Sequence, residues 1–217
     1  MNLIIEPANK EQLKWAQEQV ILHHYRHTAV DPRCRPFAYI VWLSAEPVGC
    51  LIYGRPQATR CYTGKLTYGS YQDVQARKAR FDRWEILNLA RVWLSPSIQR
   101  DGSEYVPHAA SLVIRESMKR IGFDYLMQAP PVDCAFPYQI RCIMSYCDTK
   151  YHSGWIYMAS RFKYSHKNDD GKVTYMKVIP GLTDQQDAYI QCLAEMNSRS
   201  QRIRAKRNQL TFKEMMA

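Results

Sequence analysis

Three histidines and a tyrosine lie within five residues of the sequence, His23-His24-Tyr25-Arg26-His27. If the helix expected before them continues through this stretch, His23 and His27 share a face, and His24 and His27 are near neighbours on it. Neutral imidazoles are common ligands of transition metals, so either pair can begin a metal site that a third ligand completes. The alternative for each of them is a solvated histidine at the edge of the core.

Arg91 lies in a nearly continuous apolar segment, residues 84–94, which is typical of a strand covered on both faces. In a regular strand its side chain would share a face with Leu87, Leu89 and Trp93. A guanidinium is unfavourable there unless an anion or hydrogen-bond partners meet it. Two interpretations stay open: an ion pair with a carboxylate inside the fold, or a contact with an anionic or carbonyl group of a substrate or cofactor.

A polar loop, residues 95–102, follows this strand and leads into a helical pattern that Gly122 is predicted to end. The backbone N–H groups and the dipole of a helix N-terminus favour an anion such as a pyrophosphate. We therefore predict that a cofactor contacts Arg91, Gln99, Arg100, Gly102, Ser103 and Ser111.

Asp148 ends an expected strand, residues 140–148. Ligands of open α/β sheets bind at the carboxyl ends of strands. Its carboxylate can therefore be a general base, a metal ligand or a helix cap. The metal set predicted on this basis is His24, His27 and Asp148.

The elements that must position these residues alternate between strand and helix patterns. Expected strands cover 2–7, 37–43, 48–53, 84–94, 140–148, 163–166 and 173–179, and residues 44–47 form a four-residue hairpin connection. Helices are expected after Asn9, after the loop 95–102, over 155–162 and from Thr183, whereas 54–83 and 123–138 are expected to be irregular. This order predicts an α/β (α+β) fold with a mixed central sheet flanked by helices, basic insertions and a C-terminal tail. We expect a catalytic domain in residues 1–182 and a basic helical extension in residues 183–217.

The composition is that of a globular protein with an unusual charge. Charged residues make up 23% and apolar residues 46% of the 217 residues, which is ordinary, but the net charge is +10 and the pI about 9.3. Such a charge indicates an acidic partner, most simply nucleic acid. The sequence has no apolar run long enough to span a membrane and no signal peptide, so we expect a cytoplasmic protein. The seven cysteines are dispersed, which argues against disulfides and a structural zinc site.

Basic residues concentrate in two parts of the chain. Residues 54–83 interleave cations with tyrosines, which suits contact with a phosphate backbone, although a solvated loop is the alternative. Residues 198–207 contain five cations and no acid. The nucleic-acid contacts predicted from these and the preceding loop are Arg33, Arg35, Arg55, Arg60, Arg199, Arg202, Arg204, Lys206 and Arg207.

The order of elements resembles the GCN5-related acetyltransferase fold. The phosphate loop of that superfamily carries Gln/Arg-x-x-Gly-x-Gly/Ala, and Gln99 and Gly102 match it, whereas Glu104 stands in place of the second small residue. The resemblance implies an acetyltransferase-like catalytic domain and acetyl-CoA as a donor.

A closer resemblance is to the Mom family of phage DNA-modification proteins. It rests on several unusual motifs in one order: His24-Tyr25, Arg33-x-Arg35-Pro36, residues 49–56, residues 87–96, residues 145–148 and residues 152–157. The resemblance implies conversion of adenine in double-stranded DNA to its N6-carbamoylmethyl form, which protects phage DNA from host restriction. It also links the chain to acetyl-CoA and to iron.

The expected catalytic residues are His24, Tyr25, Arg91, Tyr146 and Asp148. The product joins nitrogen to a methylene carbon, which acyl transfer alone does not give. Either a metal-assisted step activates the methyl group of an acetyl donor, or an activated glycyl donor, with tRNA as a carrier, supplies the unit. The adenine must also leave the base stack. Two other functions stay open: an N-acetyltransferase acting on aminoacyl-tRNA or protein amines, and a nucleic-acid-binding protein without activity.

Overall fold

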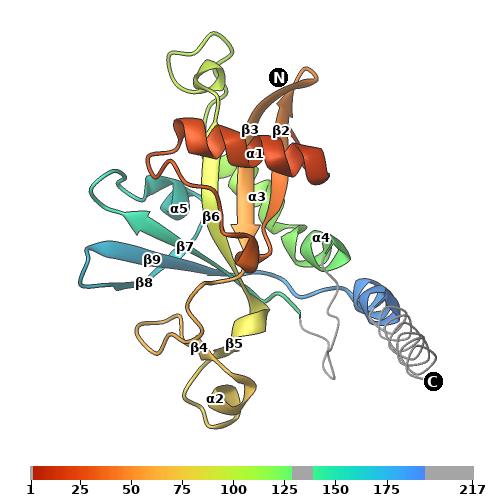
Figure 1. Cartoon of the computed structure of the whole chain (residues 1–217), viewed down its shortest axis with the longest axis vertical. Helices are drawn as coiled ribbons and strands as arrows, with labels where there is room; N and C mark the ends of the chain where they lie inside the picture. The colour runs from red at the N-terminus through yellow and green to blue at the C-terminus, as the bar shows by residue number, and fades with distance from the viewer. Residues whose placement is uncertain (1, 129–138, 194–217) are drawn as a thin grey trace, which may run out of the picture.

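Seven strands form one mixed sheet in the computed structural model, which describes residues 2–128 and 139–193 (Figure 1). Their order is β1-β2-β3-β6-β7-β9-β8, and every neighbouring pair is antiparallel except β6 and β7. The strands are β1 (Ile4–Pro7), β2 (Phe37–Leu43), β3 (Glu46–Gly54), β6 (Ile86–Leu94), β7 (Cys142–Asp148), β8 (Lys163–Lys167) and β9 (Lys172–Val178). The predicted fold class, a mixed sheet flanked by helices, is confirmed.

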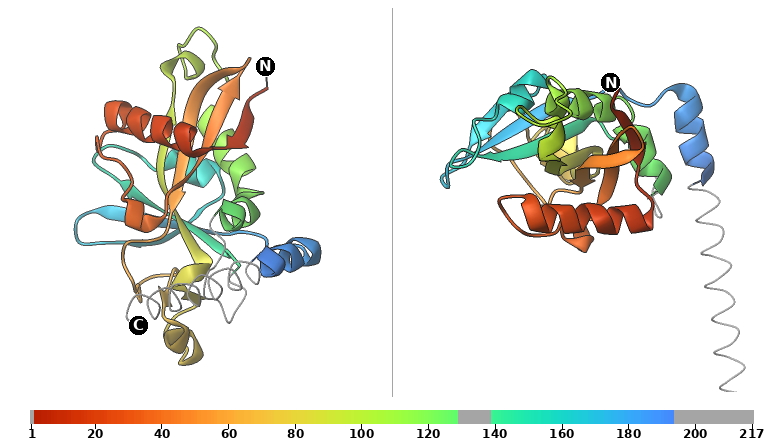
Figure 2. Two further views of the ribbon diagram at one scale, coloured as in Figure 1. Left: turned by 45° about the vertical axis from the view of Figure 1, so that its right-hand side comes forward. Right: turned by 90° about the horizontal axis from the view of Figure 1, so that it is seen from above.

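Helices cover the sheet on both faces (Figure 2). Helix α1 (Lys10–His23) lies on one face, above a smaller core that includes Ala16, Val20, Ile40 and Ile52. Helices α3 (Ala109–Met118), α4 (Ile121–Gln128) and α5 (Trp155–Ala159) pack on the other face. No helix in the described ranges is long and apolar enough to cross a membrane.

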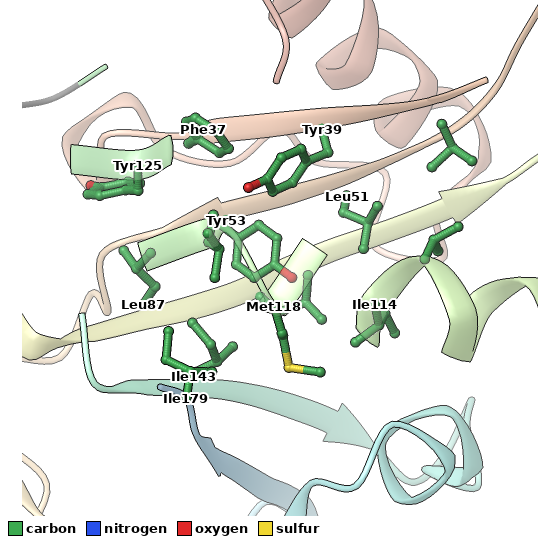
Figure 3. Packing of buried hydrophobic residues seen from close by; sticks show 14 of the residues in the cluster. Phe37, Tyr39, Leu51, Tyr53, Leu87, Ile114, Met118, Tyr125, Ile143 and Ile179 are labelled. Carbon is green, nitrogen blue, oxygen red and sulfur yellow. The ribbon is translucent and has the colours of Figure 1, made fainter. Parts of the chain in front are cut away.

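The larger core fills the space between the sheet and α3 and α4 (Figure 3). Its aromatic part is Phe37, Tyr39, Tyr53 and Tyr125, all buried. Two of the tyrosine hydroxyls form hydrogen bonds. Tyr39 donates to Asp124 at 2.8 Å, and Tyr53 bonds to a serine of α3 at 2.7 Å. Burial of polar tips without such bonds would be unfavourable, so these bonds fix how α3 and α4 sit on the sheet.

The expected extension from residue 183 begins as a helix over residues 184–193. Ile190 of this helix is buried in the larger core, and Tyr189 contacts Phe123 of α4. Its first turns therefore pack on the sheet domain. The cation run at 198–207, and with it Arg199, Arg202, Arg204, Lys206 and Arg207, lies outside the described residues.

α1 begins where the sequence predicted, because Asn9 and Gln12 form a reciprocal capping box. The helix ends at His23, and His24 is already extended, with φ −84° and ψ 139°. The prediction that His23 and His27 share a helical face is therefore wrong. His23 instead stacks on Trp93 of β6, with ring centroids 5.2 Å apart.

β6 has one residue more than β3 in the middle of their pairing. Ile52 lies opposite Arg91 and Tyr53 lies opposite Leu89, so Ala90 has no partner. This is a β-bulge, which disturbs the alternation of side chains along the strand.

The bulge changes the face on which Arg91 lies. Leu87 and Leu89, before the bulge, belong to the larger core, whereas Trp93, beyond it, packs in the smaller core beneath α1. Arg91 lies on the α1 face with Trp93, opposite Ile52 of that same core. The prediction that Arg91 shares a face with Leu87 and Leu89 assumed a regular strand and is wrong for that reason.

Residues 55–83 form an insertion below the sheet (Figure 1). Two short parallel strands, β4 (Tyr68–Gly69) and β5 (Phe81–Asp82), enclose helix α2 (Tyr71–Gln75). The expected irregular stretch thus has a small structured part, which is anchored by apolar contacts with β6, β7 and β9. The buried residues of that contact are Leu66, Tyr68, Phe81, Ile86, Cys142, Met144 and Met176.

Residues 121–128 form α4 rather than the expected irregular connection. Gly122 is buried inside this helix and does not end the preceding one, so that prediction is wrong. The break falls instead after Met118, and the next helix buries Ile121, Tyr125 and Leu126 at helical spacing. The six cysteines of the described ranges are free, and Cys34, Cys50, Cys142 and Cys147 are buried, as expected of small core residues.

The connection between β2 and β3 is a two-residue loop rather than the four residues expected. Ser44 and Ala45 both have positive φ, 49° and 71°, as a type I′ turn requires, and Glu46 already pairs with Leu43. The tight turn matches the twist of the strands but places two side chains in the left-handed region.

We expect the double change Ser44→Asn and Ala45→Gly to raise the free energy of unfolding by about 1 kcal/mol, because Asn-Gly adopts this turn without that strain. Urea denaturation with an unchanged slope measures it. Ala45→Val, which is worse in this region, should lower the same quantity, and a gain in that variant would contradict the turn assignment.

Candidate active site

The site lies where the two parallel strands separate. β6 and β7 pair only over three positions, the last being Asn88 with Met144. One residue later the Ser145 hydroxyl donates to the Leu89 carbonyl at 2.8 Å. Beyond it, the strands diverge (Figure 1). The bulge at Ala90 and the carboxyl end of β7 therefore flank a gap in the sheet.

The segment after α1 crosses the α1 side of this gap. It is held at Val30, whose N–H and carbonyl both bond to the Gln17 side chain, at 2.8 and 3.3 Å. Between α1 and this tether lie His24, Tyr25 and Thr28. The helix end thus places the predicted histidine and tyrosine next to residues of β6 and β7.

Aromatic rings connect this segment to the loop after β7. Tyr25 stacks on Tyr151, with centroids 4.7 Å apart, and meets His152 edge-on at 4.9 Å. The ring of His24 lies 4.3 Å from that of Tyr25. The N–H groups of Tyr151 and His152 donate to the Asp148 carbonyl, so this loop is a turn built on the end of β7.

Arg91 reaches this cluster from β6. Its guanidinium donates to the Ala90 carbonyl at 2.7 Å and to the Thr28 hydroxyl at 3.2 Å. Its Nε is buried without a partner, and no carboxylate among the described residues forms an ion pair with it. Burial lowers the pKa of Arg91, with Arg26 adding to the effect. The sequence left open an ion pair between Arg91 and a carboxylate inside the fold. No such ion pair is formed among the described residues.

His24 is neutral at physiological pH. Burial, with a smaller contribution from the positive charge of Arg91, lowers its pKa to about 4. Its Nδ1 accepts a hydrogen bond from the N–H of Arg26 at 3.2 Å. Because an acceptor at Nδ1 fixes the proton on Nε2, the other ring nitrogen is a hydrogen-bond donor.

Asp148 and Tyr146 both belong to β7. An Asp148 oxygen accepts from the N–H of Lys150 at 3.1 Å, and its charge raises the pKa of Tyr25, whose burial is the larger cause. Tyr146 is 39% exposed and lies beside Tyr68 of the insertion rather than beside Tyr25. The structure therefore brings together His24, Tyr25, Arg91 and Asp148, and places Tyr146 at the margin.

The predicted metal set is not assembled. His27 has a positive φ of 45°, and its Nδ1 lies 2.9 Å from the Ile21 carbonyl. In the described ranges, no group of three or more His, Cys, Asp or Glu side chains is arranged to hold an ion. His24, His27 and Asp148 therefore do not fit the iron that the family resemblance implied.

The predicted phosphate loop is closed on itself. The N–H of Gly102 donates to the Gln99 carbonyl at 2.9 Å, and the Gln99 side chain donates to the Leu94 carbonyl at 2.6 Å. Arg100 and Ser103 are exposed. The loop continues to His108 before α3 begins, so Gln99–Ser103 does not form the helix N-terminus. Ser111 is in the first turn of α3, whose N-cap His108 makes no side-chain cap bond.

Backbone N–H groups for a phosphate are thus available at the start of α3 and not in the Gln99–Gly102 loop. A CoA pyrophosphate fits Ser111 and its neighbours, and the Gln99–Gly102 backbone does not fit it. Ala110 and Ser111 would supply the N–H donors.

The predicted nucleic-acid contacts differ in their surroundings. The side chain of Arg33 is 90% exposed but is paired with Asp31 at 2.6 Å, and Arg35 is exposed in a left-handed conformation. Arg60 is exposed, 3.8 Å from Asp73. Arg55 instead points inward, donating to the Trp84 and Ile86 carbonyls and lying 5.0 Å from the ring of Tyr125. Its position is that of a structural residue.

Three residues near the site were not predicted from the sequence. Thr28 binds Arg91, and Tyr151 and His152 contact Tyr25. The signal available for the last of them was its place at the start of the motif 152–157. Thr28 and Tyr151 carry no such signal, because only the path of the chain brings them to the gap.

Comparisons with known proteins give one family. The family model described as the Mom protein family matches residues 2–214. No curated protein matches the chain.

Several solved structures that resemble the chain are described as acetyltransferases. A Bacillus subtilis acetyltransferase in complex with CoA has 9% identity and a TM-score of 0.42, covering 82% of this chain and 100% of that one. The aminoglycoside acetyltransferase AAC(6')-Ib in complex with paromomycin and acetyl-CoA has 12% identity and a TM-score of 0.46, covering 86% and 96%. An IAA acetyltransferase from Bacillus cereus has 8% identity and a TM-score of 0.46, covering 82% and 100%.

We expect the imidazole of His24 to titrate near pH 4 in an NMR pH series, assigned by comparison with His24→Gln. The unfolded chain takes up this proton at the ordinary pKa of 6.5, so the free energy of unfolding contributed by His24 is present above pH 6.5 and is lost as the pH falls toward 4. Arg91→Met should raise the midpoint but leave it below 6.5, because burial remains the larger cause. A midpoint near 6.5 in the wild type would contradict the buried position of His24.

Proposed function

The chain belongs to the Mom protein family, and on that premise we propose that it is a DNA-modification enzyme that converts adenine to its N6-carbamoylmethyl form. The observation that carries the proposal is the guanidinium of Arg91, half-buried at the strand gap with no carboxylate partner among the described residues. A desolvated cation is unfavourable without a counter-charge, so it is expected where a ligand supplies one. Around it lie a neutral imidazole, a phenol and a carboxylate, which can exchange protons with that ligand.

An activated glycyl ester is the donor that we favour. In this route the glycyl amine attacks C6 of adenine, a C–N bond forms, and the C6–amino bond breaks to release ammonia. The ammonia then attacks the ester carbonyl and expels the alcohol, which leaves a primary amide. Every atom is accounted for without an oxidant, whereas bond formation at the methyl group of acetyl-CoA requires one. A tRNA carrier would also suit the net charge of +10.

The side chains have distinct roles in this route. Arg91 stabilises the developing charge on the ester carbonyl, because its half-buried guanidinium forms no ion pair with a carboxylate of the described residues. Asp148 accepts a proton from the attacking amine. His24, neutral at physiological pH, donates from Nε2 to an oxygen or nitrogen of the substrate. Tyr25 is held in place by its stack with Tyr151.

The insertion of residues 55–83 is the surface that we expect to hold the DNA backbone. Its two acids are used internally: Asp73 caps α2 through Ser70, and buried Asp82 accepts from the N–H of Trp84. Five of its cations are exposed, and four of these form no ion pair within the described ranges: Lys65, Arg77, Lys78 and Arg80. This division of charges leaves a positive surface suited to phosphates.

We expect Arg91→Met to reduce modified adenine at least 100-fold while the melting temperature stays equal or rises, because the variant removes a half-buried charge that has no ion pair in the described structure. Mass analysis of nucleosides from cells that express each variant measures the product. Arg115→Met is the matched control, since Arg115 on α3 also has a buried Nε without a partner and lies away from the gap. Full modification by Arg91→Met would remove Arg91 from the site.

The same cells identify the donor. Labelled glycine should place its nitrogen and both carbons in the modified nucleoside. Label from acetate alone would instead favour acetyl-CoA. Acetyl transfer to other amines with unmodified DNA, or DNA binding with no product at all, would each overturn the proposed reaction.

We expect Lys65→Gln and Lys78→Gln each to lower the slope of log affinity against log salt by about one, since each removes one phosphate contact. Fluorescence anisotropy on a duplex at several salt concentrations measures the slope. Lys119→Gln is the control, because this lysine is paired with Glu116 at the end of α3, on the other face of the sheet. Equal slopes in all four proteins would place the DNA elsewhere.

A further inference from the structure

Asn88 has a buried carboxamide oxygen that makes no hydrogen bond with any described residue. The rest of the residue is partly exposed. Buried side-chain oxygens are nearly always paired in folded proteins, so an unpaired one calls for an explanation. Because the two ends of a carboxamide can exchange places, Asn88 offers one acceptor and one donor side by side.

The position of Asn88 points to a ligand at the strand gap. It is the last residue of β6 that pairs with β7, opposite Met144, and the bulge at Ala90 follows directly. Asn88 lies opposite Gly54 of β3 and Arg91 lies opposite Ile52, two residues away. At roughly 3.3 Å per residue the two side chains emerge about 7 Å apart on one face. Both carry a buried polar atom without a partner.

Residues predicted to contact nucleic acid lie on this face of the sheet. A side chain at Gly54 would meet the Cys34 carbonyl at 3.1 Å, so the turn η1 (Pro32–Cys34) covers the same side of β3. Exposed Arg33 and Arg35 belong to or follow that turn, and the insertion lies below it. The start of α3, by contrast, packs on the opposite face.

On the basis of the proposed function, we propose that Asn88 reads the extruded adenine, accepting from its N6 amino group and donating to its N7. Adenine presents a donor and an acceptor at these atoms, and a carboxamide pairs with both. Guanine presents two acceptors there, so its O6 would face the Asn88 oxygen. Enzymes that act on a flipped base recognise it by hydrogen bonds to its edge. Arg91, further along β6, stays free for the donor.

The test uses equilibrium binding, which needs no donor. The probe is a duplex with one adenine opposite an abasic site, which lowers the energy of extrusion, and otherwise identical duplexes carry 7-deazaadenine or guanine at that position. We expect the wild type to bind the 7-deazaadenine duplex about tenfold more weakly than the adenine duplex. Asn88→Leu should bind those two equally and should melt at an equal or higher temperature, because an unpaired polar group is removed.

The Asn88→Asp variant gives a second, independent test in the same binding measurement. It keeps the size and the acceptor but replaces the donor by a charged oxygen, which repels N7. The preference should therefore reverse, with 7-deazaadenine bound more tightly than adenine. This variant keeps the proposal testable if Asn88→Leu fails to fold.

Two results would overturn the inference: a wild type indifferent to 7-deazaadenine, or an Asn88→Leu variant that keeps the full wild-type preference for adenine over 7-deazaadenine. Neither result touches the proposed function while cells that express the wild type still contain modified adenine. If those cells contain none, the proposed function fails on its own test.

Discussion

The extra residue at Ala90 is the constraint on which the rest of the site depends. Without it, Arg91 would enter the larger core beside Leu87 and Leu89, where no described side chain could meet its charge. With it, the guanidinium turns to the face covered by α1, where Thr28 accepts a hydrogen bond. The bulge also comes just after the last paired position of β6 and β7, so the strand distorts at the place where the sheet opens.

The order of elements could be predicted from the sequence because the periods of apolar residues are clear, as in the near-continuous run of β6 and the capping box at Asn9. The bulge could not be predicted, because no glycine or proline next to Ala90 indicates it. The bulge arises from the pairing of β6 with β3, which the sequence does not show. The same holds for α4, where Gly122 sits in a helix that tertiary packing stabilises. Four residues of the predicted site do lie together, and each belongs to one of the sequence motifs: His24, Tyr25, Arg91 and Asp148. The predicted metal set was wrong because it assumed that α1 continues to His27.

The acidic and basic residues of the insertion have different roles. In the insertion, the acids are bound to backbone N–H groups that would otherwise be unpaired, while the neighbouring cations remain exposed. Arg55 differs from these exposed cations, because it donates to the Trp84 and Ile86 carbonyls and so connects the insertion to β6. A high net charge can therefore coexist with a stable insertion, since the acids stabilise the fold locally and leave the outer surface positive.

The gap between β6 and β7 also has a chemical reason on the proposed function. Joining a glycyl unit to C6 of a purine requires the nucleophile to approach across the plane of the base, while the base edge is held in that plane by Asn88. Asn88 and Arg91 emerge on the same face of the sheet, so the base and the donor meet beside the place where β6 and β7 separate. The low pKa of His24 keeps its imidazole neutral at physiological pH, so that on the proposed function Nε2 donates a hydrogen bond to the substrate without adding a second positive charge beside Arg91.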